Sequence, residues 1–237
     1  WSSAIVKTLD PIISDEEIFA AAEADEKMSS LLDEVIAWKR ANPADDLLTA
    51  LIQAEEDGDR LSARELRDQV SLLFVAGHET TVNLIGTGIY ELLRDPKQAK
   101  ILRDNPSLDV NAVDELLRFV SPVQFSRRIT TSDINVDGYS IDKGSVVLTG
   151  LASANRDPAK WGDDAERIDV QRTGTAQHVS FGSGSHYCLG SSLARLEAQV
   201  AIGRFLRRFP DAKIVSEAEW NGRINLRGVE RLELSVH

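Results

Sequence analysis

The chain lacks most of the features that would set it apart from ordinary globular proteins. It has a single cysteine, Cys188, so no disulfide can form within it. No apolar stretch approaches the roughly 18 residues that a transmembrane helix needs, so no membrane span is expected. Basic residues are in deficit, with 27 Lys and Arg against 38 Asp and Glu and a formal net charge of -11. This deficit argues against binding to nucleic acid or to an anionic membrane surface, because both require a basic face.

The chain also lacks an initiator methionine, and its only methionine is Met28. Its first residues, 1–3, have neither the basic start nor the apolar core of a signal peptide. Two explanations fit these facts: the chain is a processed product, or it is a piece of a longer protein. Against a typical domain of roughly 150 residues, its 237 residues suggest one large domain or two small ones. No repeat, low-complexity tract or flexible linker divides it.

Apolar periodicity predicts one long central helix over about 62–94. A capping box marks its start, because Ser62 is followed three residues later by Glu65. Pro96 marks its end, because proline cannot continue a helix and restricts the residue before it. At about thirty residues, the helix is far longer than the usual roughly 11–12 and should cross the middle of a domain. Its apolar and small positions are Leu66, Val70, Leu73, Phe74, Gly77, Thr81, Leu84, Ile85, Gly88 and Leu92.

The rest of the chain adds more helix and a small β part. Residues 1–60 are acidic and have a helical pattern. β-rich runs separated by turn dipeptides follow over about 127–149. A last long helix is expected over about 189–209, where Pro210 ends it. Together these patterns predict a mainly α fold with a small antiparallel β part.

The cysteine lies in a glycine-rich loop over 181–190. Three glycines, Gly182, Gly184 and Gly190, leave backbone N–H groups uncovered and let a partner come close to the main chain. The last long helix is predicted to begin directly after Cys188, and a helix N-terminus favours a thiolate over a thiol. The loop is therefore suited to hold an anionic sulfur against a flat partner.

Three interpretations of Cys188 remain open from the residues alone. It could be a buried structural thiol, although the glycines and the helix start argue against that. It could be a nucleophile backed by an arginine, but the spacing to Arg195 is one residue too long for the thiolate-phosphatase pattern. It could be a metal thiolate. A lone cysteine without a Cys or His cluster then suits a haem iron better than zinc, which takes three or four protein ligands.

The loop resembles the cysteine signature of the cytochrome P450 family of haem-thiolate monooxygenases, Phe-x-x-Gly-x-x-x-Cys-x-Gly. Every fixed position of that signature is present, as Phe181, Gly184, Cys188 and Gly190. The resemblance implies that Cys188 is the metal ligand of a haem b (iron protoporphyrin IX). It also implies that the other loop residues, Gly182 included, lie against the haem.

The long predicted helix carries a second motif that is similar to one of this family. Ala76, Gly77, Glu79 and Thr80 match its oxygen-activation pattern of small residue, glycine, any residue, acid and threonine. A glycine in mid-helix costs about 1 kcal/mol relative to alanine, which makes sense if a group packs against the bare backbone. The resemblance implies that Ala76 and Gly77 contact the haem, and that Glu79 and Thr80 are catalytic and deliver protons to iron-bound oxygen. The alternative for Thr80, a hydrogen bond to its own helix carbonyl, is common for isolated threonines.

The family also has a Glu-x-x-Arg motif, and the sequence Glu-Leu-Leu-Arg occurs twice. One copy is Glu91 to Arg94 and the other is Glu115 to Arg118. On a helix, residues three apart share a face and can pair. The second copy stands directly before the β segment, as in the family, so the resemblance makes Glu115 and Arg118 the structural pair, with Arg172 as its third member. The first copy is interpreted as an ordinary surface pair.

Further residues follow from the same resemblance. Arg128 at the start of the β region and His186 in the cysteine loop would hold the haem propionates. Arg127 is an alternative to Arg128, and on a strand it would face the other way. The segment expected along the substrate pocket consists of Val123, Gln124 and Phe125.

The resemblance covers nearly all of 1–237 and implies a single C-terminal haem-binding portion of a bacterial cytochrome P450, without the N-terminal helical half of the fold. The activity it implies is insertion of one oxygen atom of O2 into a small hydrophobic substrate, lipid-, terpenoid-, steroid- or polyketide-like. Electrons would come from a ferredoxin-type or flavoprotein donor, in the cytoplasm. Two alternatives stand beside it: a truncated haem-binding module without efficient turnover, and a peroxide-dependent oxygenase. The peroxide users usually lose the acid–threonine pair that is retained here.

Overall fold

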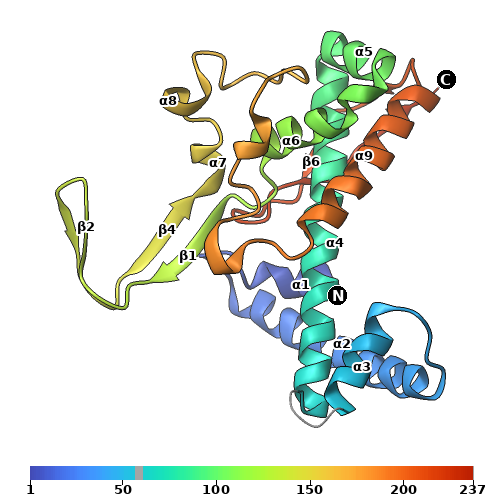
Figure 1. Ribbon diagram of the computed structural model, residues 1–237, viewed down its shortest axis with the longest axis vertical. Helices are drawn as coiled ribbons and strands as arrows, with labels where there is room; N and C mark the ends of the chain where they lie inside the picture. The colour runs from blue at the N-terminus through green and yellow to red at the C-terminus, as the bar shows by residue number, and fades with distance from the viewer. Residues whose placement is uncertain (57–60, 237) are drawn as a thin grey trace. The chain divides into compact units, whose positions relative to one another are not determined.

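The computed structural model describes residues 1–56 and 61–236. The chain divides into two compact units, Trp1–Glu79 and Thr80–His237, and one helix, α4 (Ala63–Arg94), runs through the division (Figure 1). The mainly helical fold with small antiparallel sheets that the sequence predicts is confirmed. Among the described residues, no helix is both long and apolar enough to cross a membrane.

The first unit is helical. Its elements are α1 (Ser2–Lys7), α2 (Asp15–Ala41), α3 (Leu47–Glu56) and the first part of α4. Helix α2 begins with a capping box, because the Ser14 hydroxyl accepts from the Glu17 N–H and the Glu17 carboxylate accepts from the Ser14 N–H. The core of the unit includes Ile36, Ile52 and Leu66, one each from α2, α3 and α4.

The second unit packs its helices around a main apolar core that includes Leu84, Leu116 and Ile202. Its helices are the rest of α4, α5 (Pro96–Asp104), α6 (Asp109–Val120), the short α7 (Leu151–Ala154) and α8 (Pro158–Trp161), and α9 (Ser191–Arg208). A Cβ added to Gly88 would lie 3.2 Å from Ile202 Cδ1 and 3.3 Å from Leu116 Cδ1. The glycine therefore lets α4 lie close to both α6 and α9. Three 3-10 turns complete the helical part, η1 (Pro106–Leu108), η2 (Thr175–Gln177) and η3 (Gly184–His186).

The strands of the second unit form two-stranded antiparallel sheets. The pairs are β1 (Phe125–Ile129) with β4 (Val146–Gly150), β2 (Ile134–Val136) with β3 (Tyr139–Ile141), β5 (Lys213–Ile214) with β8 (Leu234–Ser235), and β6 (Glu219–Trp220) with β7 (Val229–Arg231). The β2–β3 hairpin turns at Asp137 and Gly138, both with positive φ, of 49° and 85°. Two positive φ values are what a tight type I′ hairpin requires, which explains the Asp-Gly dipeptide there.

Candidate functional site

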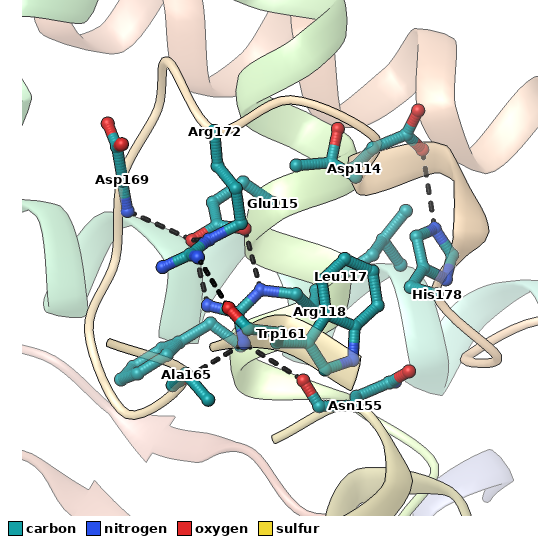
Figure 2. A network of polar contacts seen from close by, with 12 residues as sticks. Asp114, Glu115, Leu117, Arg118, Asn155, Trp161, Ala165, Asp169, Arg172 and His178 are labelled. Carbon is teal, nitrogen blue, oxygen red and sulfur yellow. Dashed lines mark hydrogen bonds and ion pairs between the residues drawn. The ribbon is translucent and has the colours of Figure 1, made fainter. Parts of the chain in front are cut away.

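A buried ion pair lies at the centre of the second unit. On α6, Arg118 Nε donates to Glu115 Oε2 at 2.7 Å and Arg118 Nη2 donates to Glu115 Oε1 at 2.8 Å, and both side chains are fully buried (Figure 2). Such a two-pronged contact is the strongest form of carboxylate–guanidinium bond. The remaining N–H groups of Arg118 donate to the backbone carbonyls of Asn155, Ala165 and Arg167 at 2.8–2.9 Å. All five guanidinium hydrogens are thus used.

Arg172 joins this pair from the loop before the cysteine. Its Nε donates to Glu115 Oε1 at 3.2 Å and its Nη1 donates to Asp164 Oδ1 at 2.9 Å. Burial by itself would lower the pKa of Arg172, but the hydrogen bond that it donates to Asp164 and the charge of Glu115 raise the pKa above its ordinary value. The Asp169 N–H also donates to Glu115 Oε1, at 2.9 Å. The structure therefore brings together the three residues expected as a structural triad.

The other Glu-Leu-Leu-Arg copy has a different setting. At the end of α4, Arg94 Nη1 lies 3.3 Å from Glu91 Oε2, and the Arg94 side chain is 57% exposed. The same Glu-Leu-Leu-Arg sequence therefore forms a surface ion pair at the end of α4 and a buried ion pair in α6. The two settings differ because the Glu and Arg of α6 lie on a helix face that points into the core, whereas Arg94 of α4 points to solvent.

A second polar cluster fastens the cysteine loop to α6. Asp114, next to Glu115, faces both His178 Nε2 at 3.3 Å and Arg195 Nε at 2.7 Å. The Ser180 N–H donates to His178 Nδ1 at 3.1 Å, so the imidazole hydrogen lies on Nε2 and is donated to Asp114. The Arg195 guanidinium also lies over the Phe181 ring, 4.6 Å from its centre. Figure 2 shows His178 reaching toward α6.

Asp114 has a pKa below its ordinary value, and the cause predicts how stability depends on pH. Burial alone would raise the pKa of this carboxyl, but the hydrogen bonds from His178 and Arg195 outweigh that effect. A depressed folded-state pKa stabilises the fold above the unfolded-state pKa, and this stabilisation is lost as the pH falls through the folded-state value. Asp114→Asn should therefore destabilise the protein at neutral pH by about 2 kcal/mol, since it removes charge-assisted hydrogen bonds.

The difference in the free energy of unfolding between wild type and Asp114→Asn should narrow below about pH 4, where an ordinary aspartate begins to take up its proton. Urea unfolding at several pH values measures it. Asp211→Asn, at an exposed position of the same unit, is the matched control and should follow the wild-type curve. A difference in unfolding free energy that stayed constant from pH 7 down to the lowest pH measured would contradict a lowered pKa at Asp114.

Asn155 is a buried connection that sequence reasoning missed. It is 1% exposed. Its side-chain amide donates to Ser121 Oγ at 2.9 Å and Ser180 Oγ at 2.7 Å, and its Oδ1 accepts from the Val179 N–H at 2.8 Å. Asp114 and His178 were missed as well. For all three the only sequence signal is a polar residue beside apolar ones, which is weak because their partners are far away along the chain.

The cysteine loop itself is shaped by backbone hydrogen bonds. The Cys188 N–H donates to the Phe181 carbonyl at 2.9 Å, and Gly182 and Gly184 have φ of +72° and +71°. Cys188 is a free, half-buried thiol. Helix α9 begins at Ser191, two residues later than the sequence predicts. Glycine adopts positive φ values of this kind without strain, since it has no Cβ.

The space around the loop fits a flat partner. A Cβ added to Gly184 or Gly190 would meet no atom within 4 Å, so the surface beside these glycines is open. The following helix favours negative charge at its N-terminus. No group of three or more His, Cys, Asp or Glu suited to a metal occurs in the part of the chain that the structure describes. The donor set is thus one sulfur in an open, glycine-lined loop, which fits a haem iron rather than zinc.

The remaining sequence-predicted residues of the second unit lie at its surface or in its loops. His186 and Arg128 are exposed, and Arg128 Nη1 donates to Ser126 Oγ at 2.5 Å and to the Arg127 carbonyl at 2.8 Å. Their expected partner is a haem propionate, so their role remains a proposal.

The expected substrate-pocket segment runs between α6 and β1. Val123 pairs with Leu226 in an isolated bridge, and Phe125 begins β1. Gln124 Nε2 donates to the Ser121 carbonyl at 2.5 Å, so its amide is engaged with backbone. Gln124 also borders a hollow of about 420 Å³ whose other lining residues include Phe119, Arg156 and Arg227.

In the first unit, the motif on α4 has one buried acid. Glu79 is 8% exposed and accepts a hydrogen bond from the Ser2 hydroxyl at 2.9 Å. Ala76 and Gly77 lie one turn earlier, and a Cβ on Gly77 would meet nothing within 4 Å. Thr80 follows on the same helix and is half-buried. The bare backbone at Gly77 is therefore open, as a helix face that receives a partner should be.

Comparison with known proteins places these features in a family. The family model described as "Cytochrome P450" matches residues 9–107 and 108–216. The chain is 47% identical over 217 residues to cytochrome P450 107B1 of Saccharopolyspora erythraea, covering 90% of this chain and 53% of that protein. It is 42% identical to a vitamin D(3) 25-hydroxylase of Pseudonocardia autotrophica, covering 100% and 58%.

Solved structures agree with the sequence relatives. The fold superposes with a TM-score of 0.92 and 36% identity on P450BioI in complex with an acyl carrier protein that bears hexadec-9Z-enoic acid, covering 99% of this chain and 60% of that one. The chain thus spans between about half and three fifths of the length of these relatives: 53%, 58% and 60%.

Proposed function

Because the chain belongs to the cytochrome P450 family, we propose that it is the haem-binding part of a monooxygenase that inserts one atom of O2 into a small organic substrate. The observation that carries this proposal is the cysteine loop. Cys188 lies in a half-buried position before α9, among glycines that leave the loop surface open. Cys188 would hold the iron of haem b through its sulfur. Bound haem would supply the iron on which O2 is activated, with a thiolate donor that favours O–O cleavage.

The residues around the loop would position the cofactor. Phe181, Gly182, Gly184 and Gly190 would lie against the haem face, and Ala76 and Gly77 of α4 would offer bare backbone to it. His186 and Arg128 would bind the propionates, because both side chains are exposed and both carry N–H groups that can donate to an anion. The triad of Glu115, Arg118 and Arg172 would hold the segment before the loop in place through its buried contacts.

Proton delivery would fall to Glu79 and Thr80. A buried carboxylate beside a hydroxyl can pass a proton inward, which the reduction of O2 requires. The presence of this acid–threonine pair favours O2 over peroxide as the oxidant. Electrons would come from a ferredoxin-type or flavoprotein donor.

The substrate would be a small hydrophobic molecule, lipid-, terpenoid-, steroid- or polyketide-like. Val123, Gln124 and Phe125 would line its pocket. One relative is named for vitamin D(3) and one solved structure holds a fatty acyl chain on a carrier protein, and both ligands are long and apolar. That shared chemistry supports the class without selecting a member of it.

The test is isotope labelling of the haem-loaded protein. A panel of fatty acids, steroids and polyketides is incubated with ferredoxin, its reductase, a reductant and labelled O2. A product that carries one heavy oxygen atom from O2, and none from labelled water, supports the proposal. Oxygen drawn from water, or turnover only with added peroxide, would contradict it.

A further inference from the structure

The hydroxyl of Ser2 touches two neighbouring side chains of α4. Ser2 Oγ donates to Glu79 Oε1 at 2.9 Å, and it lies 3.0 Å from His78 Nδ1. Ser2, at the start of α1, is 7% exposed and Glu79 is 8% exposed, whereas the His78 side chain is 51% exposed. All three residues belong to the first unit. One hydroxyl therefore connects a buried carboxylate to a half-exposed imidazole.

Counting hydrogens fixes the direction of both contacts. A serine hydroxyl has a single hydrogen to donate, and Ser2 gives it to Glu79. The contact with His78 must then run the other way, from Nδ1–H to Ser2 Oγ. His78 consequently carries a hydrogen on Nδ1, either as the neutral Nδ1–H tautomer or as the imidazolium. The hydrogen bond made by one ring nitrogen sets the tautomer of the whole ring.

The imidazole is also held from a second side. The ring of Phe74, one turn earlier on α4, stacks on His78 with centres 6.0 Å apart and planes inclined by 12°. This stacking and the Ser2 contact together fix the plane of the imidazole. Roughly half of the side chain remains in contact with solvent, which can supply protons to it.

We propose that His78, Ser2 and Glu79 form a relay that carries protons from solvent to the Glu79 carboxylate. The relay rests on the proposed function, in which Glu79 passes protons inward. Ser2 and His78 act through Glu79 and are positioning residues. The relay explains why a polar residue of α1 is buried against α4 at this point.

The transfer balances without any other reactant. The Nδ1–H bond of a His78 imidazolium breaks and its proton binds Ser2 Oγ, while the hydrogen that Ser2 held moves to Glu79 Oε1. The products are a neutral imidazole with its hydrogen on Nε2, a serine hydroxyl and a neutral carboxylic acid. After Glu79 gives up its proton, the Ser2 hydroxyl rotates back to Glu79, and Nδ1 of His78 takes up a proton from solvent, which restores the imidazolium.

The ring tautomer provides a test that does not depend on turnover. Nitrogen NMR of ¹⁵N-histidine-labelled protein, in the diamagnetic reduced carbon-monoxide form at about pH 8 where an ordinary imidazole is neutral, reports which nitrogen bears the hydrogen. The His78→Gln variant assigns the signal. We expect Nδ1–H at His78, and a switch to Nε2–H in Ser2→Ala. His178 is the internal reference and should show Nε2–H, because its Nδ1 accepts from the Ser180 N–H.

Turnover then tests the role of the contact. Ser2→Ala should lower kcat by on the order of 10-fold with KM unchanged, which is less than the roughly 10²–10⁴-fold that positioned proton transfer can contribute, because Glu79 itself is retained. Ser2→Ala should also divert electrons from the reductant into the formation of peroxide instead of oxygenated product. Ser2→Thr keeps a hydroxyl and should restore both kcat and coupling. Ser30→Ala, at an exposed position of α2, is the control and should match wild type.

The outcomes separate the relay from the proposed function. Nε2–H at His78 in the wild type overturns the relay. Two turnover results also overturn the relay and leave the monooxygenase proposal intact. In one, Ser2→Ala forms product as fast as wild type; in the other, Ser2→Thr is as impaired as Ser2→Ala. Absence of oxygenated product from the wild type overturns the proposed function, and with it the role of the relay, whichever tautomer is found.

Discussion

Replacing Arg118 by methionine should lower the free energy of unfolding by about 3–5 kcal/mol, the cost of removing one member of a buried ion pair. Methionine fills similar space, so the loss comes from charge and hydrogen bonding. Glu115 would remain fully buried without its bidentate partner, and three backbone carbonyls would lose their donor. Urea unfolding followed by circular dichroism measures the change.

The chain contains its own control for this experiment. Arg94→Met removes the arginine from the other Glu-Leu-Leu-Arg copy, where the pair is exposed. An exposed ion pair is worth about 0–1 kcal/mol, so this variant should remain close to wild type. The assignment of Glu115 and Arg118 as the structural pair would be refuted if the two variants lost similar stability. If Arg118→Met yields no folded protein while Arg94→Met does, the expected difference is met in its strongest form.

Replacing Cys188 by serine should abolish the spectral signature of thiolate ligation. A serine hydroxyl is a far poorer donor to iron than a thiolate, because it stays protonated near neutral pH. The reduced, carbon-monoxide-bound variant should therefore lose the red-shifted Soret band that thiolate-ligated haem gives, and oxygenation of substrate should stop. Absorption spectra of wild type and variant, at equal haem content, measure the effect.

Ser185→Ala is the matched control for the cysteine variant. Ser185 lies in the same loop, within η3, and is exposed. The control separates loss of the sulfur from general disturbance of the loop and should keep the band. A Cys188→Ser protein that retained the red-shifted band would disprove the ligand assignment.

Local signals accounted for most of what the sequence predicted. The capping box at Ser62 and Glu65 is present as two reciprocal hydrogen bonds, and α4 ends at Arg94, where Pro96 requires it. The start of α9 was predicted two residues early. The chain from Cys188 to Gly190 is still turning there: the Ser191 N–H donates to the Cys188 carbonyl at 3.3 Å, and the Ala194 N–H donates to the Gly190 carbonyl at 2.9 Å in the first helical turn. Apolar periodicity does not locate such a turn.

Long-range polar contacts could not be predicted in the same way. Asp114 lies next to a residue that was singled out, yet its partners His178 and Arg195 are 64 and 81 residues away. Asn155 binds two segments 34 and 25 residues away. Which polar side chain becomes buried depends on how loops cross the helices, and one sequence carries little information on that. The bond from the Gln124 amide to the Ser121 carbonyl is a local contact three residues apart, and apolar periodicity gives no sign of it either.

Every N–H group of Arg118 has an acceptor in the folded protein, and this has a consequence for the order in which the chain can fold during synthesis. The guanidinium leaves the ribosome on α6 well before its backbone acceptors, which lie 37, 47 and 49 residues further along the chain. Until those residues emerge, Glu115 alone faces the cation, and water must solvate the other hydrogens. Burying α6 earlier would strand a partly unpaired charge in an apolar core. Final docking of α6 should therefore wait until the chain has emerged as far as residue 167, which ties the helix to the arrival of the segment that precedes the cysteine loop.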